Sequence, residues 1–309
     1  MRKNSIKGYL CVMAAAVMWA SSGVAGKALF AEGMSPFELV QVRVTVSTLL
    51  LAVILGWFRR DLLRIRKTDL GHFLLLGGVA MSMVQITYFF AISKIQVAAA
   101  IFLEYLAVSM VAVFSIWFWK ERVTWLKSFS LFLALAGCYL VVGGYSLDFL
   151  RMKWVGIVSG LLSAVCFAGY TLIGERSMHR YPPWTVLFYA FLFATLTWHI
   201  IYPPFHYLVA GYTLRAWCGL LYVSVMGTVL PFGLFFVGVN YIRSTRAAIT
   251  ATLEPVSAGV LAYFFLDERL ESLQILGGVM VVAAIVLLQL QRERDEMAPS
   301  HIRMSRIDF

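Results

Sequence analysis

The sequence predicts an all-α integral membrane protein with ten transmembrane helices, arranged as two inverted-topology repeats of five helices each. Three observations predict this fold. The 309-residue chain is 61% hydrophobic and only 14% charged, with a mean hydropathy of +0.81, whereas soluble domains have roughly 45–50% apolar and about 25% charged residues. Ten apolar segments are long enough to cross a bilayer, which takes about 20 residues. The two halves of the chain also resemble each other.

The ten apolar segments follow one another with short links, so no soluble domain of useful size lies between them. Residues 1–145 hold the first repeat, residues 146–291 hold the second, and the polar tail 292–309 is expected to be disordered. The first segment is too long for a typical cleaved signal peptide, so we interpret it as a retained helix. The predicted spans, in order, are 8–29, 38–58, 70–92, 97–118, 128–145, 155–175, 184–202, 217–239, 246–266 and 272–290.

The distribution of basic residues predicts the orientation of the chain. With the N-terminus in the cytoplasm, 19 of the 26 Lys and Arg residues lie on the inner side, 6 lie outside, and Arg43 lies within a span. This bias satisfies the positive-inside rule, so both termini are expected in the cytoplasm. The net charge of +10 therefore reflects topology and not a nucleic-acid partner. We expect an integral protein of a bacterial-type plasma (inner) membrane, in contact with the lipid bilayer.

Three stretches of the first half recur in the second half at nearly one offset. Each copy holds five helices, an odd number, so the second copy must enter the membrane from the opposite side. Inverted repeats are typical of secondary transporters, whose site lies near the midplane, although channels and some membrane enzymes also have them. The matched pairs are "TYFFAISKI" (87–95) with "LFFVGVNYI" (234–242) and "WKERV" (119–123) with "LDERL" (266–270), both at offset 147, and "KGYLCVMAAAVMWA" (7–20) with "VGIVSGLLSAVCFA" (155–168) at 148.

Several chemistries have no signature in the sequence. "GVAGKA" (23–28) lacks the first glycine and the final Ser or Thr of a Walker A motif, so ATP-driven pumping by this chain alone is not expected. The motifs H-E-x-x-H and G-x-S-x-G are absent. The four cysteines lie singly in apolar segments, without metal-ligand spacing. No catalytic residue, cofactor or metal is therefore expected, and the chain is predicted not to be an enzyme.

Glu254 and Pro255 lie in the middle of the ninth predicted span. A charge at the bilayer centre costs on the order of 2.5–3.5 kcal/mol on insertion scales, so Glu254 should face the bundle interior or water. Pro255 cannot donate to the carbonyl of Ala251, which breaks or kinks the helix. One interpretation makes Glu254 a proton site or substrate ligand on a cavity wall. The other makes it a structural carboxylate that fixes one helix end.

Arg43 and Glu104 are charges at similar depth in the second and fourth spans. Opposite charges in apolar spans usually pair. We expect the two to form a buried ion pair or to share an outer polar network, with either a structural or a gating role.

Other polar and helix-breaking residues mark a candidate path through the bundle. Gln85 and Tyr88 lie three apart on one face of the third span, and Thr228 and Pro231 lie three apart in the eighth. Interrupted helices indicate a transporter's site, whereas interhelical hydrogen bonds would also explain Gln85 and Thr228. Trp19 could stack on a flat substrate or serve in packing.

With these features in place, the chain resembles the EamA family of the drug/metabolite transporter superfamily. The resemblance rests on "TATLEPVSAGVLAYFFLDERL" (250–270), on the looser copy "AAIFLEYLAVSMVAVFSIWFWKERV" (99–123), and on "SPFELVQVRV" (35–44). It covers about 8–142 and 155–289. It implies ten helices around a central cavity, alternating access, and movement of small organic metabolites such as amino acids, by facilitated diffusion in some relatives and with proton coupling in others.

The two halves depart from each other within this motif. Glu104 lies 17 residues before the glutamate of "KER", but Glu254 lies 14 residues before that of "DER". The two carboxylates are thus about one helical turn out of register. Tyr105 also stands where the second half has Pro255, so only the second half is expected to be broken by proline.

Two functions follow from the sequence, and they belong to different classes. The first is a secondary transporter of small organic metabolites, an exporter of amino acids or related compounds, which works by alternating access around a central cavity. The alternative is a membrane-embedded enzyme or lipid-handling protein that uses buried Glu254 and Glu104. Import or export, proton-coupled or facilitative transport, and a monomer or a homodimer are all compatible with the sequence.

Overall fold

The computed structural model describes residues 2–95, 97–119, 124–145, 153–203, 206–209, 211–266, 271–290 and 298–305, and within these it is helical without strands. The "KER" and "DER" loops at 120–122 and 267–269 lie outside the described residues. The elements are α1 (Arg2–Ala31), α2 (Pro36–Phe58), η1 (Arg60–Leu63), η2 (Lys67–Asp69), α3 (Leu70–Phe73), η3 (Leu74–Met81), α4 (Ser82–Lys94), α5 (Val97–Tyr105), α6 (Ala107–Trp119), α7 (Trp125–Val141), α9 (Trp154–Met178), α10 (Pro183–Ile201), α11 (His206–Val209), α12 (Leu214–Ser224), η4 (Val225–Val229), α13 (Leu230–Ala251), α14 (Leu253–Leu266), α15 (Ser272–Leu290) and α16 (Pro299–Ser305).

The described helices confirm a polytopic, all-helical membrane fold but not the count of ten. Seven helical stretches are long and apolar enough to cross a membrane, and two shorter apolar helices lie at 125–141 and 272–288, the predicted fifth and tenth positions. The predicted eighth span and the first residues of the ninth run together along 214–251, and α14 forms the rest of the ninth span. They change direction at Arg243, whose backbone is not helical (φ 67°, ψ 167°).

Local sequence signals explain where several helices begin. The Ser35 hydroxyl accepts a hydrogen bond from the amide of Phe37, and Glu38 Oε2 accepts one from the amide of Ser35 (3.1 Å), so a capping box starts α2. Thr124 and Thr213 cap α7 and α12 in the same way, by accepting amide hydrogen bonds.

Both repeats carry a break in their fourth helix, although proline breaks were expected in the second half alone. A single turn residue interrupts the α-helix between α5 and α6 at Leu106, and another does so between α13 and α14 at Thr252. At the repeat offset of 147, Thr252 corresponds to Tyr105, so the two breaks lie one residue apart. The third helix of each repeat also contains a π-helical stretch, η3 or η4. Proline is therefore not required for the interruption, because the first half has none at either place.

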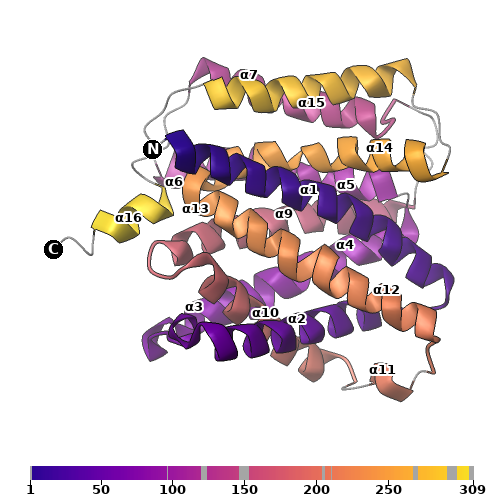
Figure 1. Cartoon of the computed structure of the whole chain (residues 1–309). Helices are drawn as coiled ribbons and strands as arrows, with labels where there is room; N and C mark the ends of the chain where they lie inside the picture. The colour runs from indigo at the N-terminus through magenta and orange to yellow at the C-terminus, as the bar shows by residue number, and fades with distance from the viewer. Residues whose placement is uncertain are drawn as a thin grey trace.

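The two repeats pack against each other through equivalent helices, as Figure 1 shows for α1 beside α13 and for α7 beside α15. Helix α1 contacts α13, and its counterpart α9 contacts α4. Gly8 and Gly156 make these approaches possible. A Cβ on Gly8 would lie 2.8 Å from Ile242 Cγ2, and one on Gly156 would lie 2.5 Å from Ile95 Cγ2. All four residues are matched pairs of the sequence repeat, so the contacts obey the predicted inverted two-fold symmetry.

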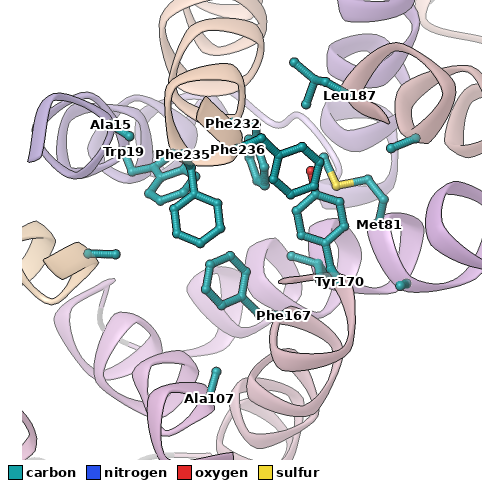
Figure 2. Packing of buried hydrophobic residues seen from close by; sticks show 14 of the residues in the cluster. Ala15, Trp19, Met81, Ala107, Phe167, Tyr170, Leu187, Phe232, Phe235 and Phe236 are labelled. Atoms are coloured by element: carbon teal, nitrogen blue, oxygen red, sulfur yellow. The ribbon is translucent and has the colours of Figure 1, made fainter. Parts of the chain in front are cut away.

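Aromatic side chains fill the centre of the bundle, as Figure 2 shows. Trp19 and Phe167 are matched positions of the repeat, and their rings meet edge to face with centroids 6.2 Å apart. Trp19 also packs on Phe232 and Phe235, at 5.0 and 5.4 Å. Because a residue touches its own symmetry mate only near the axis, the Trp19–Phe167 contact locates the pseudo-two-fold axis.

The C-terminal tail differs from its prediction, since part of it forms the short helix α16. Arg303 of α16 donates hydrogen bonds to the carbonyls of Met178 and Tyr181 and to Asn240 Oδ1 (2.7 Å). These contacts fix α16 against the end of α9 and against the middle of α13, just before its change of direction at Arg243. Figure 1 shows both chain ends on the same side of the bundle.

Candidate functional site

A cavity of about 40 Å³ lies at the centre of the bundle, between the two repeats. Helices α1, α2, α4 and α5 of the first repeat supply most of its wall, and α9, α13, η4 and α14 of the second complete it. Six predicted site residues line it: Trp19, Arg43, Gln85, Tyr88, Glu104 and Glu254. The other lining residues are Ser22, Gly23, Val84, Phe89, Tyr105, Phe167, Gly227 and Phe232.

Arg43 enters the cavity from α2 and is 3% exposed. Its Nε donates to Thr228 Oγ1 (2.8 Å), and its Nη2 donates to the carbonyl of Gly227 (2.9 Å). That carbonyl is the one to which residue 231 would donate in a regular α-helix, but Pro231 has no amide hydrogen. The Gly227 carbonyl cannot receive this backbone bond, and Arg43 donates to it instead. The guanidinium also lies 4.6 Å from the ring centroid of Phe89, in a cation–π contact.

These partners correct the expectation of a direct ion pair between Arg43 and Glu104. Among the described residues, no nitrogen of Arg43 lies within 4.0 Å of a Glu104 oxygen. The two side chains instead line the same cavity, which corresponds to the other expectation, a shared polar network. Arg43 makes its close contacts with the π-helical stretch of the eighth span.

Glu254 lies at the start of α14, directly after the break at Thr252, and is 6% exposed. Its Oε2 accepts a hydrogen bond from the Tyr105 hydroxyl (2.8 Å), which comes from the end of α5 in the other repeat. The two broken helices thus meet through this bond. Glu104, one residue before Tyr105, is partly buried and faces the same cavity.

The remaining predicted residues divide into lining and supporting positions. The amide of Gln85 makes only a weak contact with Met81 Sδ (3.6 Å), and the buried Trp19 Nε1 has no hydrogen-bond partner among the described residues. Thr228 and Pro231 do not line the cavity. Thr228 accepts a hydrogen bond from Arg43, and Pro231 has no amide hydrogen to donate to the Gly227 carbonyl, which Arg43 binds. Pro255 does not line the cavity.

Sequence reasoning did not select Tyr105 or Phe167 as site residues. The signal for Tyr105 was its position directly after Glu104, opposite the proline of the other repeat. The signal for Phe167 was its match with Trp19 in the repeat.

Two further charged residues hold the helix junctions at opposite ends of the bundle. Lys27 Nζ, from α1, donates to the carbonyls of Ile92 (2.6 Å) and Ile95 (3.2 Å), where α4 ends. Glu175, from α9, is its match at offset 148 and accepts from the amide of Ser244 (2.7 Å) and from Arg243 Nε (3.3 Å).

We call these two contacts the Lys27 clasp and the Glu175 clasp. Each joins the first helix of a repeat to the junction between the third and fourth helix of the same repeat. The cation binds carbonyl groups, and the carboxylate binds an amide and a guanidinium.

Two repeats of one helical pattern around a polar cavity form an architecture that is typical of membrane transporters. The sequence profile of the EamA-like transporter family matches residues 6–143 and 154–290 of this chain. The chain belongs to this family, and the resemblance found in the sequence is confirmed.

Similar proteins carry transporter names. An uncharacterized transporter of Archaeoglobus fulgidus is 30% identical over 202 residues, 65% of this chain and 70% of its own length. The uncharacterized inner membrane transporter YicL of Salmonella typhimurium is 27% identical over 93% of this chain and 97% of its own. The pseudopaline exporter CntI of Pseudomonas aeruginosa is 30% identical over 70% of this chain and 74% of its own length. A crystal structure with 17% identity shares the fold, with a TM-score of 0.73 over 92% of this chain and 96% of its own.

Proposed function

We propose that this transporter moves small zwitterionic metabolites, amino acids or related compounds, out of the cell by alternating access around the central cavity. The observation that carries the proposal is that one guanidinium, Arg43, and two carboxylates, Glu104 and Glu254, line the same cavity between the repeats. Burying three charges is costly, and a structural role for all of them would not require that they share one cavity.

The polar groups of the cavity suit both ends of a zwitterion. Arg43 has five N–H donors, of which two are bonded within the described residues, and guanidinium groups bind carboxylates well. Trp19 Nε1 is a further donor without a partner there. Glu104 and Glu254 can accept from an ammonium group, and Tyr105 orients the second carboxylate.

Alternating access requires the cavity to change volume. A water needs roughly 10–15 Å³ of such space, so about 40 Å³ holds a few waters but not an amino acid. The walls must therefore separate to admit a substrate. The Lys27 and Glu175 clasps each join helices of a single repeat, so each repeat can move as a unit against the other.

Export and proton coupling are also part of this proposal. A relative named as an exporter supports the outward direction. Glu254 is a buried carboxylate on the cavity wall, so it can carry a proton in one conformation and release it in the other. The bias of basic residues supports cytoplasmic termini, which cysteine labelling from each side would test at positions 6 and 300.

Solute flux in proteoliposomes tests the proposal. Zwitterionic, cationic and anionic amino acids would be compared, with and without a pH gradient, against empty liposomes. We expect zwitterionic compounds to move fastest and a proton gradient of the appropriate sign to increase their flux. If no solute of the panel moves, the transport proposal fails, and the alternative of a lipid-handling protein or enzyme gains support.

A further inference from the structure

A second pocket, of about 550 Å³, opens at the end of the bundle that carries both chain termini. Arginines dominate it, and we call it the arginine pocket. Its wall comes from the link after α2, from the link after α9, and from the C-terminal helix α16. The lining residues are Arg64, Ile65, Arg66, His179, Arg180, Tyr181 and Arg303.

The charge of the arginine pocket is only partly compensated. Arg180 pairs with Asp69 at 3.1 Å, and Arg303 donates to neutral acceptors, two carbonyls and the amide oxygen of Asn240. Arg64 and Arg66 are exposed and have no ion pair within the described ranges. Several arginines therefore face one space with a single carboxylate bonded among them, which favours an anionic ligand.

Hydrogen bonds fix the walls of this pocket relative to each other. The Tyr181 hydroxyl donates to Asp69 Oδ2 (2.6 Å) and accepts from the amide of Arg66 (3.2 Å). Arg303 Nη1 donates to the carbonyl of Tyr181 (3.1 Å). The three segments that carry the arginines are thus tied together through Tyr181. Such a site is largely formed before the ligand binds, so binding costs less entropy for ordering side chains and loops.

The position of the pocket along the membrane normal suggests the source of the anion. Trp57 and Phe58, at the end of α2, are 80% and 75% exposed. Exposed aromatic residues at a helix end are typical of the interface, where rings lie at headgroup level. Arg64 and Arg66 follow within a few residues, so their guanidinium groups lie near the phosphate groups of one leaflet. Basic pockets between helices at such a face bind anionic headgroups.

The geometry points to the arginine pocket as a binding site for a phosphate group, presented by an anionic phospholipid headgroup or by free phosphate. The ligand would bridge the link after α2 in the first repeat, the link after α9 in the second, and the C-terminal helix. Its binding would therefore hold the two repeats and the tail together at one face of the membrane. Guanidinium groups provide the paired donors that phosphate oxygens accept.

Thermal unfolding of the purified full chain in detergent, followed with added lipid, tests this site. Phosphatidylglycerol, phosphatidylcholine and inorganic phosphate would be titrated separately, and native mass spectrometry would count retained lipids. We expect phosphatidylglycerol to raise the unfolding temperature and phosphatidylcholine to leave it unchanged. If inorganic phosphate at millimolar concentration gives the same rise, the site stands with free phosphate as its ligand. If none of the three binds, the proposal is overturned.

Two double variants separate the pocket from general surface charge. Arg64→Gln/Arg66→Gln removes two charges from the pocket. Arg59→Gln/Arg60→Gln removes two charges from the neighbouring stretch, where Arg59 pairs with Asp61 at 3.1 Å, outside the pocket. We expect phosphatidylglycerol affinity to fall roughly tenfold or more in the first and to change little in the second, since each basic contact with an anionic lipid contributes measurably. Equal losses in both variants, or no loss in the first, would contradict the site. Unchanged size-exclusion profiles would show that both variants fold.

Discussion

The Tyr105 hydroxyl donates a 2.8 Å hydrogen bond to Oε2 of Glu254 and thereby joins the broken fourth helix of one repeat to the broken fourth helix of the other. Both residues line the central cavity. A carboxylate in an apolar bundle needs such a partner, because an unsatisfied buried acceptor is costly. The bond thus explains how Glu254 is kept inside the fold, and it connects the two interrupted helices through one polar contact.

Tyr105→Phe removes the donor to Glu254 and leaves the ring in place. We expect a loss of about 1–3 kcal/mol in unfolding free energy, because the buried carboxylate loses a partner. Tyr170→Phe is the matched control, since the buried Tyr170 hydroxyl has no hydrogen-bond partner among the described residues. Chemical unfolding of both variants in mild detergent gives the comparison, and equal stability of the two would contradict the assigned role of Tyr105.

Arg43 and Pro231 should show coupled energies. Arg43→Gln leaves the Gly227 carbonyl without its donor, at a cost of about 1–3 kcal/mol. Pro231→Ala restores an amide hydrogen that can reach this carbonyl, so the same Arg43→Gln change should cost less in that background. A double-mutant cycle on unfolding free energy measures the coupling. Strictly additive effects would show that the proline-freed carbonyl does not hold Arg43.

The Glu175 clasp holds a strained backbone. Arg243 has φ 67° and ψ 167°, a conformation that costs of order 1–3 kcal/mol for a residue other than glycine. Glu175→Gln removes the charge that accepts hydrogen bonds from Arg243 Nε and from the Ser244 amide, so we expect a loss of about 1–3 kcal/mol. Adding Arg243→Gly removes both the charge and the strain, and it should recover part of this loss. The free energy of unfolding would be measured for the single and double variants. An unchanged value in Glu175→Gln would contradict the stabilising role of the Glu175 clasp.

The inverted symmetry predicts equal sensitivity at matched glycines. Gly8→Ala and Gly156→Ala each force a methyl group against a neighbouring helix, and we expect each to cost about 1–3 kcal/mol. Gly169→Ala is the control, because a Cβ there meets nothing within 4 Å. It should be neutral or stabilise the helix by up to about 1 kcal/mol. A large difference between the two matched glycines would argue against equivalent packing in the two repeats.

The sequence predicted the membrane fold, the repeat and six of the fourteen residues that line the cavity, because these depend on local and costly features. An arginine or a glutamate in an apolar span must face the interior, so Arg43, Glu104 and Glu254 could be selected without any knowledge of their neighbours. The repeat offset likewise paired Gly8 with Gly156 and Trp19 with Phe167 before their contacts were known.

The partners of these residues could not be predicted, because they depend on tertiary packing. Depth alone suggested that Arg43 pairs with Glu104, but the carbonyl of Gly227 and the hydroxyl of Thr228 lie closer. No proline or glycine lies beside Leu106, so the sequence contains no signal that predicts this break. The helix at 299–305 is fixed by Arg303, a contact that the polar composition of the tail does not reveal.

Proton-driven flux of a zwitterionic amino acid into proteoliposomes, compared between wild type, Glu254→Gln and Glu271→Gln, tests the central claim most directly. Glu271 is an exposed carboxylate bonded to Tyr145, far from the cavity lining, and serves as the control. We predict that the pH gradient increases the flux equally in wild type and in Glu271→Gln. In Glu254→Gln this increase should be smaller by roughly tenfold or more, because the group that carries the proton is missing. Flux that is unchanged in Glu254→Gln and indifferent to the gradient would contradict the claim and make Glu254 a structural carboxylate.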